Sequence, residues 1–167
     1  PEKGGHTGFI DQIAAYDALP ENLKRAIEGK AVIYTGNFDA SGLKFGKRPT
    51  RTLFIEQGWL DASKHAAVRA RSIHPMVYVQ KETGRNVLNV SPWFADGIEG
   101  MENDEGDALL REVTEHIMAP GREYYHRWTP GEMVLWDNWR MLHCACGTPT
   151  GMKRLMRRTT IFGDYAL

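Results

Sequence analysis

The sequence predicts a mainly β fold, a sandwich or jelly roll, with helices packed on its outside. Two observations support this prediction. Short apolar or alternating segments recur in the second half of the chain, separated by turn sequences such as KETGR (81–85) and Pro130-Gly131. Clear helical periodicity covers only two longer segments, residues 9–28 and 103–118. Short strands joined by tight turns, with few helices, are typical of two packed sheets.

The first expected element is a helix in two pieces over 9–28. Apolar residues share one face of the first piece, Pro20 suits the first turn of the second, and Gly29 ends it. The clearest helix covers Asn103–Met118. Acidic residues begin it, a row of apolar residues follows one face, and Pro120-Gly121 ends it.

Strands are expected where apolar residues run together or alternate. Residues 36–72 have no clear period and contain four glycines and one proline, so we expect an irregular insert or lid with a short helix at 61–71. The expected strands are Ala31–Thr35, Met76–Gln80, Asn86–Val90, Tyr124–Trp128, Glu132–Asp137, Arg140–Cys146 and Arg154–Phe162.

Composition excludes several classes of protein. The chain has 167 residues, a length typical of one domain, so we treat 1–167 as a single domain. Its 21 basic and 21 acidic residues balance, which argues against binding to nucleic acid. No apolar run reaches the length of about 20 residues that a membrane helix needs, and no secretory signal is visible. Two cysteines point to a reducing compartment, so we expect a cytoplasmic protein.

Charge is unevenly distributed along the chain. Residues 44–71 contain seven basic and two acidic side chains, whereas residues 96–107 contain six acidic side chains and no basic one. The basic run is either a lid that attracts an anionic substrate or a solvated loop. The acidic run is expected to be a solvated loop and the start of a helix.

The last expected strand carries arginines on one face. In a regular strand, Arg154 and Arg158 point the same way and lie about 13 Å apart, four steps of about 3.3 Å. An inward-facing guanidinium needs an anion, because an unpaired buried charge costs several kcal/mol. The two side chains therefore either bind two separate anions or lie on a solvated face.

His143 and the two cysteines are expected on opposite faces of one strand. Alternation directs the thiols of Cys144 and Cys146 away from the imidazole, which argues against a shared metal site. Cysteines two apart in a strand are about 6.6 Å apart at Cα, a poor fit for a disulfide. We expect both cysteines to pack as small apolar residues, and His143 to be either a metal ligand or a hydrogen-bonded residue.

Four segments in this order resemble one family of enzymes. They are GGHTGF (4–9), HPMVYVQKETGRNVLNV (74–90), RWTPGEMVLWDN (127–138), and the signature WDN-x4-H followed by R-x3-R-T-T-I-x-G-D. Together they resemble the taurine dioxygenase and 2,4-dichlorophenoxyacetate dioxygenase family, which are non-haem iron(II), 2-oxoglutarate-dependent oxygenases. The resemblance covers nearly the whole chain except 36–72. It implies a double-stranded β-helix of the jelly-roll type, incomplete in this chain.

The resemblance also implies roles for individual residues. A guanidinium matches a carboxylate with two parallel hydrogen bonds, a threonine hydroxyl adds an uncharged donor, and imidazole suits iron(II). The resemblance also implies that Trp136 lies near the iron and packs there without taking part in the chemistry. The implied site residues are His143 as an iron ligand, Arg154 and Thr7 for the distal carboxylate of 2-oxoglutarate, Arg158 for an anionic group of the substrate, and Phe94 as an aromatic wall of its pocket.

The sequence departs from the family pattern in two ways. His6 stands where the family has an acid, as a pocket residue or a loop variant. The family's first histidine and its carboxylate come as H-x-D or H-x-E, and none of the six histidines here is followed two residues later by Asp or Glu. His74-Pro75 matches a hairpin motif instead. Two of three iron ligands are therefore absent from this sequence, which is either a C-terminal portion of a longer protein or a truncated protein that has lost ordinary iron binding.

Two functions are expected from these residues. The first is an Fe(II)/2-oxoglutarate-dependent dioxygenase that uses dioxygen to hydroxylate a small organic anion, with conversion of 2-oxoglutarate to succinate. The alternative is a catalytically inactive family member that binds an anion or a partner chain. An incomplete jelly roll leaves apolar faces and sheet edges open, so we expect a missing segment, a partner chain or a homo-oligomer to cover them.

Overall fold

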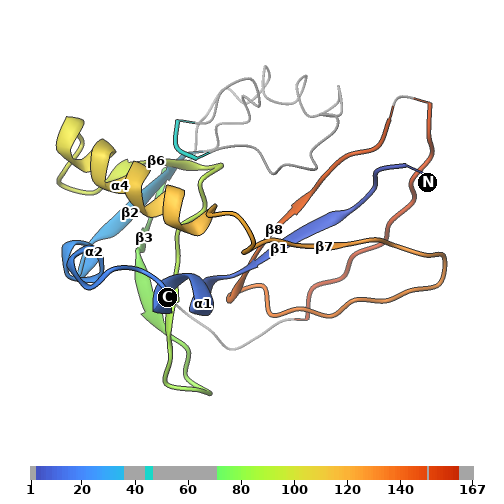
Figure 1. Ribbon diagram of the computed structural model, residues 1–167, viewed down its shortest axis with the longest axis horizontal. Coiled ribbons are helices and arrows are strands. Elements are labelled where there is room, and N and C mark those ends of the chain that lie inside the picture. The colour runs from blue at the N-terminus through green and yellow to red at the C-terminus, as the bar shows by residue number, and fades with distance from the viewer. Residues whose placement is uncertain (1–2, 36–43, 47–70, 150, 162–167) are drawn as a thin grey trace.

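The computed structural model describes residues 3–35, 44–46, 71–149 and 151–161. This part of the chain is mostly β, with few helices, and Figure 1 shows sheet β7-β1-β8 at one end and helices α2 and α4 beside strands β2, β3 and β6 at the other. In chain order the elements are β1 (Thr7–Asp11), α1 (Gln12–Asp17), α2 (Glu21–Ile27), β2 (Ala31–Thr35), β3 (Arg71–Pro75), β4 (Val77–Val79), β5 (Asn86–Leu88), β6 (Ala95–Ile98), α4 (Asp104–Ile117), β7 (Tyr124–His126) and β8 (Met141–Ala145).

β1 is a strand where the sequence predicted the start of a helix. It is the central strand of its sheet and pairs antiparallel with both β7 and β8. Phe9 and Ile10 are both buried although they point to opposite faces. A strand buried on both faces has no alternating pattern, so its apolar residues matched a helical period equally well. The hydrogen bonds of β1 to β7 and β8 make this segment a strand and not a helix.

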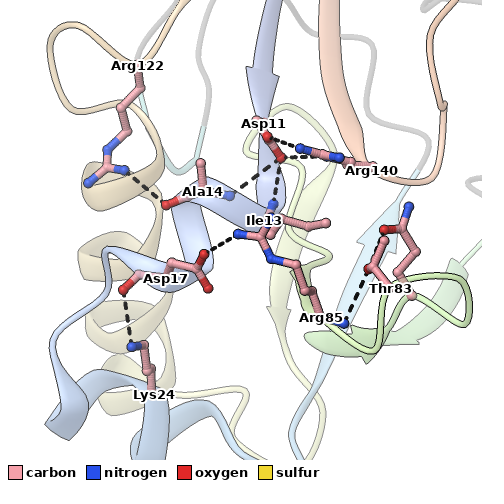
Figure 2. Close-up of polar contacts among 10 residues, drawn as sticks. Asp11, Ile13, Ala14, Asp17, Lys24, Thr83, Arg85, Arg122 and Arg140 are labelled. Carbon is pink, nitrogen blue, oxygen red and sulfur yellow. Dashed lines mark hydrogen bonds and ion pairs between the residues drawn. The ribbon is translucent and has the colours of Figure 1, made fainter.

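α1 begins at Asp11, whose carboxylate accepts hydrogen bonds from the backbone N–H groups of Ile13 at 3.0 Å and Ala14 at 3.5 Å. The same carboxylate accepts two bonds from the guanidinium of Arg140, and the Gln12 N–H donates to the Arg140 carbonyl at 3.1 Å. Figure 2 shows Asp11 between the helix N-terminus and Arg140. One side chain therefore ends β1, caps α1 and binds the segment that leads into β8.

The helix prediction for the second piece is confirmed. Pro20 occupies the N-cap of α2 and Glu21 lies in its first turn, where a negative charge suits the helix dipole. Gly29 follows the helix with a φ of +68°, a left-handed conformation that glycine adopts without strain.

The second sheet has β2 at its centre, between β3 and β6. The strand predicted at Ala31–Thr35 is confirmed with the same bounds. β3 and β6 were not predicted, because RSIHP and ADGI are too polar or too short to give a strand pattern alone. Residues 71 and 72 were expected in the irregular segment 36–72, but they pair with β2 and belong to β3. The helix expected at 61–71 lies, apart from Arg71, outside the described residues.

The hairpin and the long helix agree with the sequence. β4 pairs with β5 in the register Val77↔Leu88 to Val79↔Asn86, shorter than expected but joined by the predicted turn. In α4 the Asn103 side chain caps the helix by accepting from the Gly106 N–H at 3.0 Å. A Cβ at Gly106 would lie 2.0 Å from the Met101 carbonyl oxygen, so this position requires glycine.

Two predicted strands are wrong. β7 and β8 are present and shorter than expected, but residues 132–137 and 154–161 form no strand in the structure. Figure 1 shows these segments as extended arms at the end of the molecule that holds sheet β7-β1-β8. Their apolar side chains are exposed, with Met133 92% and Leu155 85% accessible. Extended chain becomes a strand only when a neighbour accepts its hydrogen bonds, and no strand of the described residues pairs with these arms.

The core lies between the helices, the second sheet and the hairpin. Ile10 and Leu142 join the first sheet to it, and Ile13 of α1 packs separately with Tyr78 and Val87 of the hairpin. Among the described residues, no helix combines the length and the apolar composition needed to cross a bilayer. The main cluster contains Ile10, Ala15, Leu19, Leu23, Ile27, Val32, Phe45, Met76, Leu88, Val90, Ala95, Ile98, Leu110, Val113 and Ile117.

The contacts of Asp11 give a stability prediction. Asp11→Asn retains a capping side chain but removes the charge paired with Arg140, and we expect it to lower the free energy of unfolding by about 1 kcal/mol. Asp11→Ala removes the cap as well and should cost about 1 kcal/mol more. The control is Asp17→Asn, because the Asp17–Arg85 pair is about half exposed and should contribute under about 0.5 kcal/mol. Urea unfolding of the three variants measures these differences.

The same pair predicts a pH dependence. The hydrogen bond from Arg140 is the main cause that lowers the pKa of Asp11, although partial burial opposes it. A carboxyl whose folded pKa is lowered stabilises the fold above its unfolded pKa of about 3.9, and this contribution is lost as the pH falls through the folded pKa. The difference between wild type and Asp11→Asn should therefore shrink below about pH 4. A difference that stays constant down to about pH 2 would contradict the prediction.

Candidate functional site

One face of sheet β7-β1-β8 gathers the predicted site residues. Side chains of Thr7 and Phe9 share this face because they are two apart in β1. Residues directly opposite in an antiparallel sheet point to the same side, so strand pairing adds neighbours from both flanking strands. These neighbours are His126 and Ala145 opposite Thr7, and Tyr124 and His143 opposite Phe9.

His143 lies among aromatic rings on this face. Its ring centroid is 5.3 Å from that of Trp136 and 6.4 Å from that of Phe9. Burial is the main cause that lowers the pKa of His143, and the positive charge of Arg158 lowers it further. A lowered pKa favours the neutral imidazole, the form that can bind a metal ion. Trp136 has the packing position that the sequence analysis expected.

Thr7 and Arg154 lie side by side. The Thr7 hydroxyl oxygen accepts a hydrogen bond from the Trp128 indole N–H at 2.9 Å and from the Arg154 guanidinium at 3.4 Å. Thr7 is buried, and the Nε atom of Arg154 is buried with no hydrogen-bond partner among the described residues. A buried guanidinium nitrogen without a partner is costly, and a bound carboxylate would satisfy it.

The structure places the remaining predicted residues differently. Arg158 is exposed, and its positive charge lies near enough to His143 to lower the pKa of the imidazole. Phe94 lies in the turn just before β6 of the other sheet, where its carbonyl accepts from the Thr35 N–H at the end of β2. The first sheet therefore brings together Thr7, Arg154 and His143, with Arg158 near them.

The described residues do not complete a metal site. Within 3–35, 44–46, 71–149 and 151–161, no group of three His, Cys, Asp or Glu side chains is arranged to hold a metal ion. His143 offers one imidazole to this face, and iron(II) in such oxygenases needs two histidines and a carboxylate. The donor set of this part of the chain fits one ligand of iron and the carboxylate end of 2-oxoglutarate.

The cysteines face away from this site, as expected. Cys144 is opposite Gly8, whose Cβ would lie 3.4 Å from the Cys144 sulfur, on the face that His143 does not share. Neither cysteine forms a disulfide within the part of the chain that the structure describes, and Cys146 is buried. A hydrogen bond with Cys146, together with burial, raises the pKa of the Cys144 thiol, which favours its protonated, unreactive form.

Sequence reasoning missed the polar contacts that hold the turn before β8. The Asp137 carboxylate accepts from the backbone N–H groups of Trp139 at 2.9 Å and Arg140 at 3.3 Å. Its second oxygen accepts from the side-chain amide N–H of Gln80 at 2.8 Å. The side-chain amide oxygen of Gln80 accepts from the Thr83 hydroxyl at 2.8 Å. The hairpin thus anchors the turn between Trp136 and His143. An Asp-Asn pair before a strand signals a turn, but its partner in the hairpin is far away in sequence.

The two charged runs of the sequence meet away from this face. Lys44 pairs with Asp107 at 3.2 Å, and Arg71 pairs with Glu102 at 2.9 Å. These side chains line a hollow of about 330 Å³ at the start of α4. The described ends of the basic run therefore neutralise acidic side chains, and the rest of the run, with its expected lid, lies outside the described residues.

Comparison with known proteins finds a matching family and similar relatives. Residues 1–160 match the family described as taurine catabolism dioxygenase TauD, TfdA family. The chain is 34% identical over 166 residues to an (S)-phenoxypropionate/alpha-ketoglutarate-dioxygenase of Sphingobium herbicidovorans, over 99% of this chain and 55% of the relative. It is 33% identical to an alpha-ketoglutarate-dependent 2,4-dichlorophenoxyacetate dioxygenase of Cupriavidus pinatubonensis, over 98% of this chain and 52% of the relative.

A solved structure is also similar. AAD-2 in complex with Mn(II) and N-oxalylglycine matches 84% of this chain and 46% of its own, with a TM-score of 0.59 and 27% identity. Alpha-ketoglutarate, in the names of the two relatives from Sphingobium herbicidovorans and Cupriavidus pinatubonensis, is another name for 2-oxoglutarate. The chain spans about half the length of the relatives it matches.

The contact between Gln80 and Asp137 can be tested by exchanging its donor and acceptor. Gln80→Glu alone sets two carboxylates against each other. Asp137→Asn alone sets two amide N–H donors against each other, because the oxygen of the new amide still accepts from the backbone of the turn. Each should lower the free energy of unfolding by about 1–2 kcal/mol. The double variant reverses the hydrogen bond and should recover most of this loss.

The measurements are urea unfolding and the proton chemical shifts of the His143 ring, which depend on the nearby Trp136 ring. We expect both single variants to move these shifts and the double variant to restore them. A double variant whose loss equals the sum of the two single losses would contradict the contact.

Proposed function

The chain belongs to the TauD, TfdA family, and from that premise we propose that it carries the 2-oxoglutarate end of an iron(II)-dependent dioxygenase site. One observation supports this most directly. The Thr7 hydroxyl and the Arg154 guanidinium lie 3.4 Å apart on the sheet face that also carries His143. Arg154 keeps a buried nitrogen unsatisfied among the described residues, which favours an anionic ligand.

In this proposal Arg154 binds the distal carboxylate of 2-oxoglutarate through its planar guanidinium, and Thr7 donates its hydroxyl to the same group. The keto acid end then lies toward His143, which serves as one iron ligand. Iron(II), when bound, supplies the oxidation in which one oxygen atom enters succinate and the other enters the substrate, with release of carbon dioxide. The part of the chain described here orients the cosubstrate and excludes water from its carboxylate.

The proposed substrate is a small organic anion, hydroxylated with dioxygen. Arg158 carries a positive charge beside His143 and would bind the anionic group. The rings of Phe9, Trp136 and Tyr124 pack together on the same face and offer an apolar surface. Phe94 would add an aromatic wall from the other sheet. The names of the relatives, phenoxypropionate and 2,4-dichlorophenoxyacetate dioxygenases, fit an aromatic carboxylate.

The alternative function is binding without turnover. Two observations favour it for the 167-residue chain taken alone. No group of three metal-binding side chains occurs among the described residues, and apolar side chains of the arms at 132–137 and 154–161 are exposed. Such a chain would bind an anion, a partner chain or a second copy of itself through a family fold that no longer oxidises a substrate.

The 2-oxoglutarate site predicts the effect of removing Arg154. We expect Arg154→Ala to weaken 2-oxoglutarate binding to the 167-residue chain by about 10- to 100-fold, the equivalent of one charged hydrogen-bonded contact. Arg154→Lys should lose part of this affinity, because an ammonium makes no parallel pair of bonds. Titration calorimetry measures the dissociation constants.

The matched control is Arg157→Ala, which removes an exposed arginine three residues away and should leave the affinity unchanged. If Arg154→Ala binds 2-oxoglutarate as tightly as wild type, the proposed site is wrong. If both variants weaken binding equally, the effect is one of net charge rather than of a site.

Turnover separates the two functions. With iron(II), ascorbate, dioxygen and 2-oxoglutarate, the dioxygenase function predicts succinate formation that increases when a phenoxyalkanoate or alkyl sulfonate is added. The binding function predicts that the chain retains 2-oxoglutarate affinity, lost in Arg154→Ala, and forms no succinate above a metal-free control. Quantifying succinate by mass spectrometry distinguishes these outcomes.

A further inference from the structure

We propose that Trp128 is a positioning residue for the Thr7 hydroxyl, and that its indole N–H makes this hydroxyl a donor toward the bound carboxylate. The inference rests on the proposed 2-oxoglutarate site and adds a residue to it. Trp128 follows β7 by two positions and continues the alternation of Tyr124 and His126, so it lies on the face that carries Thr7.

The argument depends on counting donors and acceptors at one oxygen. A threonine hydroxyl has one proton to donate and two lone pairs that accept. The Trp128 indole can only donate, and it does so to the Thr7 oxygen at 2.9 Å. The Arg154 guanidinium also can only donate, and its Nη2 lies 3.4 Å from the same oxygen. Both lone pairs of Thr7 are thereby used.

The hydroxyl proton of Thr7 is left to point elsewhere. With donors on two sides, the O–H bond is directed away from both Trp128 and Arg154, into the space beside the guanidinium. A carboxylate bound to Arg154 accepts hydrogen bonds only, so it fits this arrangement and a ligand group that only donates does not. Without Trp128, the hydroxyl could rotate and turn a lone pair toward the carboxylate. Trp128 therefore organises the site before the ligand arrives.

Other side chains hold Trp128 in place. The His126 ring packs edge-to-face on the Trp128 ring, with centroids 4.5 Å apart. Its Nδ1 is 3.2 Å from the Tyr124 hydroxyl, and its Nε2 is 3.3 Å from the Glu132 carboxylate. Glu132 is itself bound by the backbone N–H of Thr129 at 2.7 Å. The indole thus packs against a ring that is itself held by contacts with Tyr124 and Glu132.

The test is a double-mutant cycle on the 167-residue chain with 2-oxoglutarate as the titrated ligand. Trp128→Phe keeps an aromatic ring and removes the N–H, and Thr7→Val keeps the shape and removes the hydroxyl. Each should weaken binding by about 5- to 10-fold. The double variant should bind no more weakly than Thr7→Val alone, because Trp128 acts through the Thr7 hydroxyl.

The control is Trp93→Phe. The Trp93 indole nitrogen is buried and has no hydrogen-bond partner among the described residues, so removing it should leave the affinity unchanged. A spectroscopic measurement supplements the binding data and needs no change at Trp128. The indole proton resonance of Trp128 should move upfield, toward the value of a free indole, in Thr7→Val and stay in place in Thr7→Ser.

Three results would overturn the inference. One is a Trp128→Phe loss of the same size with and without the Thr7 hydroxyl, since that would show an independent effect of Trp128. Another is unchanged binding in Trp128→Phe while Arg154→Ala loses it, which leaves the proposed function standing. The third is unchanged binding in both Arg154→Ala and Thr7→Val, which would remove the proposed 2-oxoglutarate site and the inference together.

Discussion

The contact between Asp11 and Arg140 is the constraint on which the candidate site depends. Asp11 is at once the last residue of β1, the N-cap of α1 and the acceptor of two hydrogen bonds from Arg140 (Figure 2). The Gln12 N–H and the Arg140 carbonyl form a further bond beside it. Asp11 and Arg140 are 129 positions apart in sequence. Once these contacts form, the register between β1 and β8 is determined, because a shift of one residue would break them all.

This register determines which side chains share the face of the candidate site. With Asp11 opposite Met141, antiparallel pairing sets Phe9 opposite His143 and Thr7 opposite Ala145. Alternation then turns Thr7, Phe9 and His143 to one face, and Gly8 and Cys144 to the other. The Gln80–Asp137 bond holds the preceding turn from the hairpin side. The Asp11–Arg140 and Gln80–Asp137 contacts, from distant parts of the chain, thus determine where the His143 imidazole lies. The segment after β8 brings Arg154 to Thr7.

Several features followed from sequence alone because their causes are local. Asn103 and the acidic first turn set the start of α4, KETGR closes the hairpin, and the apolar run at Ala31–Thr35 forms β2. The motif resemblance identified the family and nominated Thr7, His143 and Arg154. Their proximity could not be read from periodicity, because a strand was expected over Arg154–Phe162 and the described residues 154–161 form none. Phe94, nominated with them, lies in the turn before β6 of the other sheet.

The amino-acid sequence by itself determined the family, the caps and turns, and the residue types that can bind a carboxylate. Only the tertiary structure decided that residues 9–11 are strand rather than helix, and that Trp128 donates to Thr7. The physical reason is the sequence separation of the interacting residues. Capping and turn formation depend on residues a few positions apart. Strand pairing and side-chain hydrogen bonds join distant positions, 121 residues apart for Trp128 and Thr7, which no local pattern encodes.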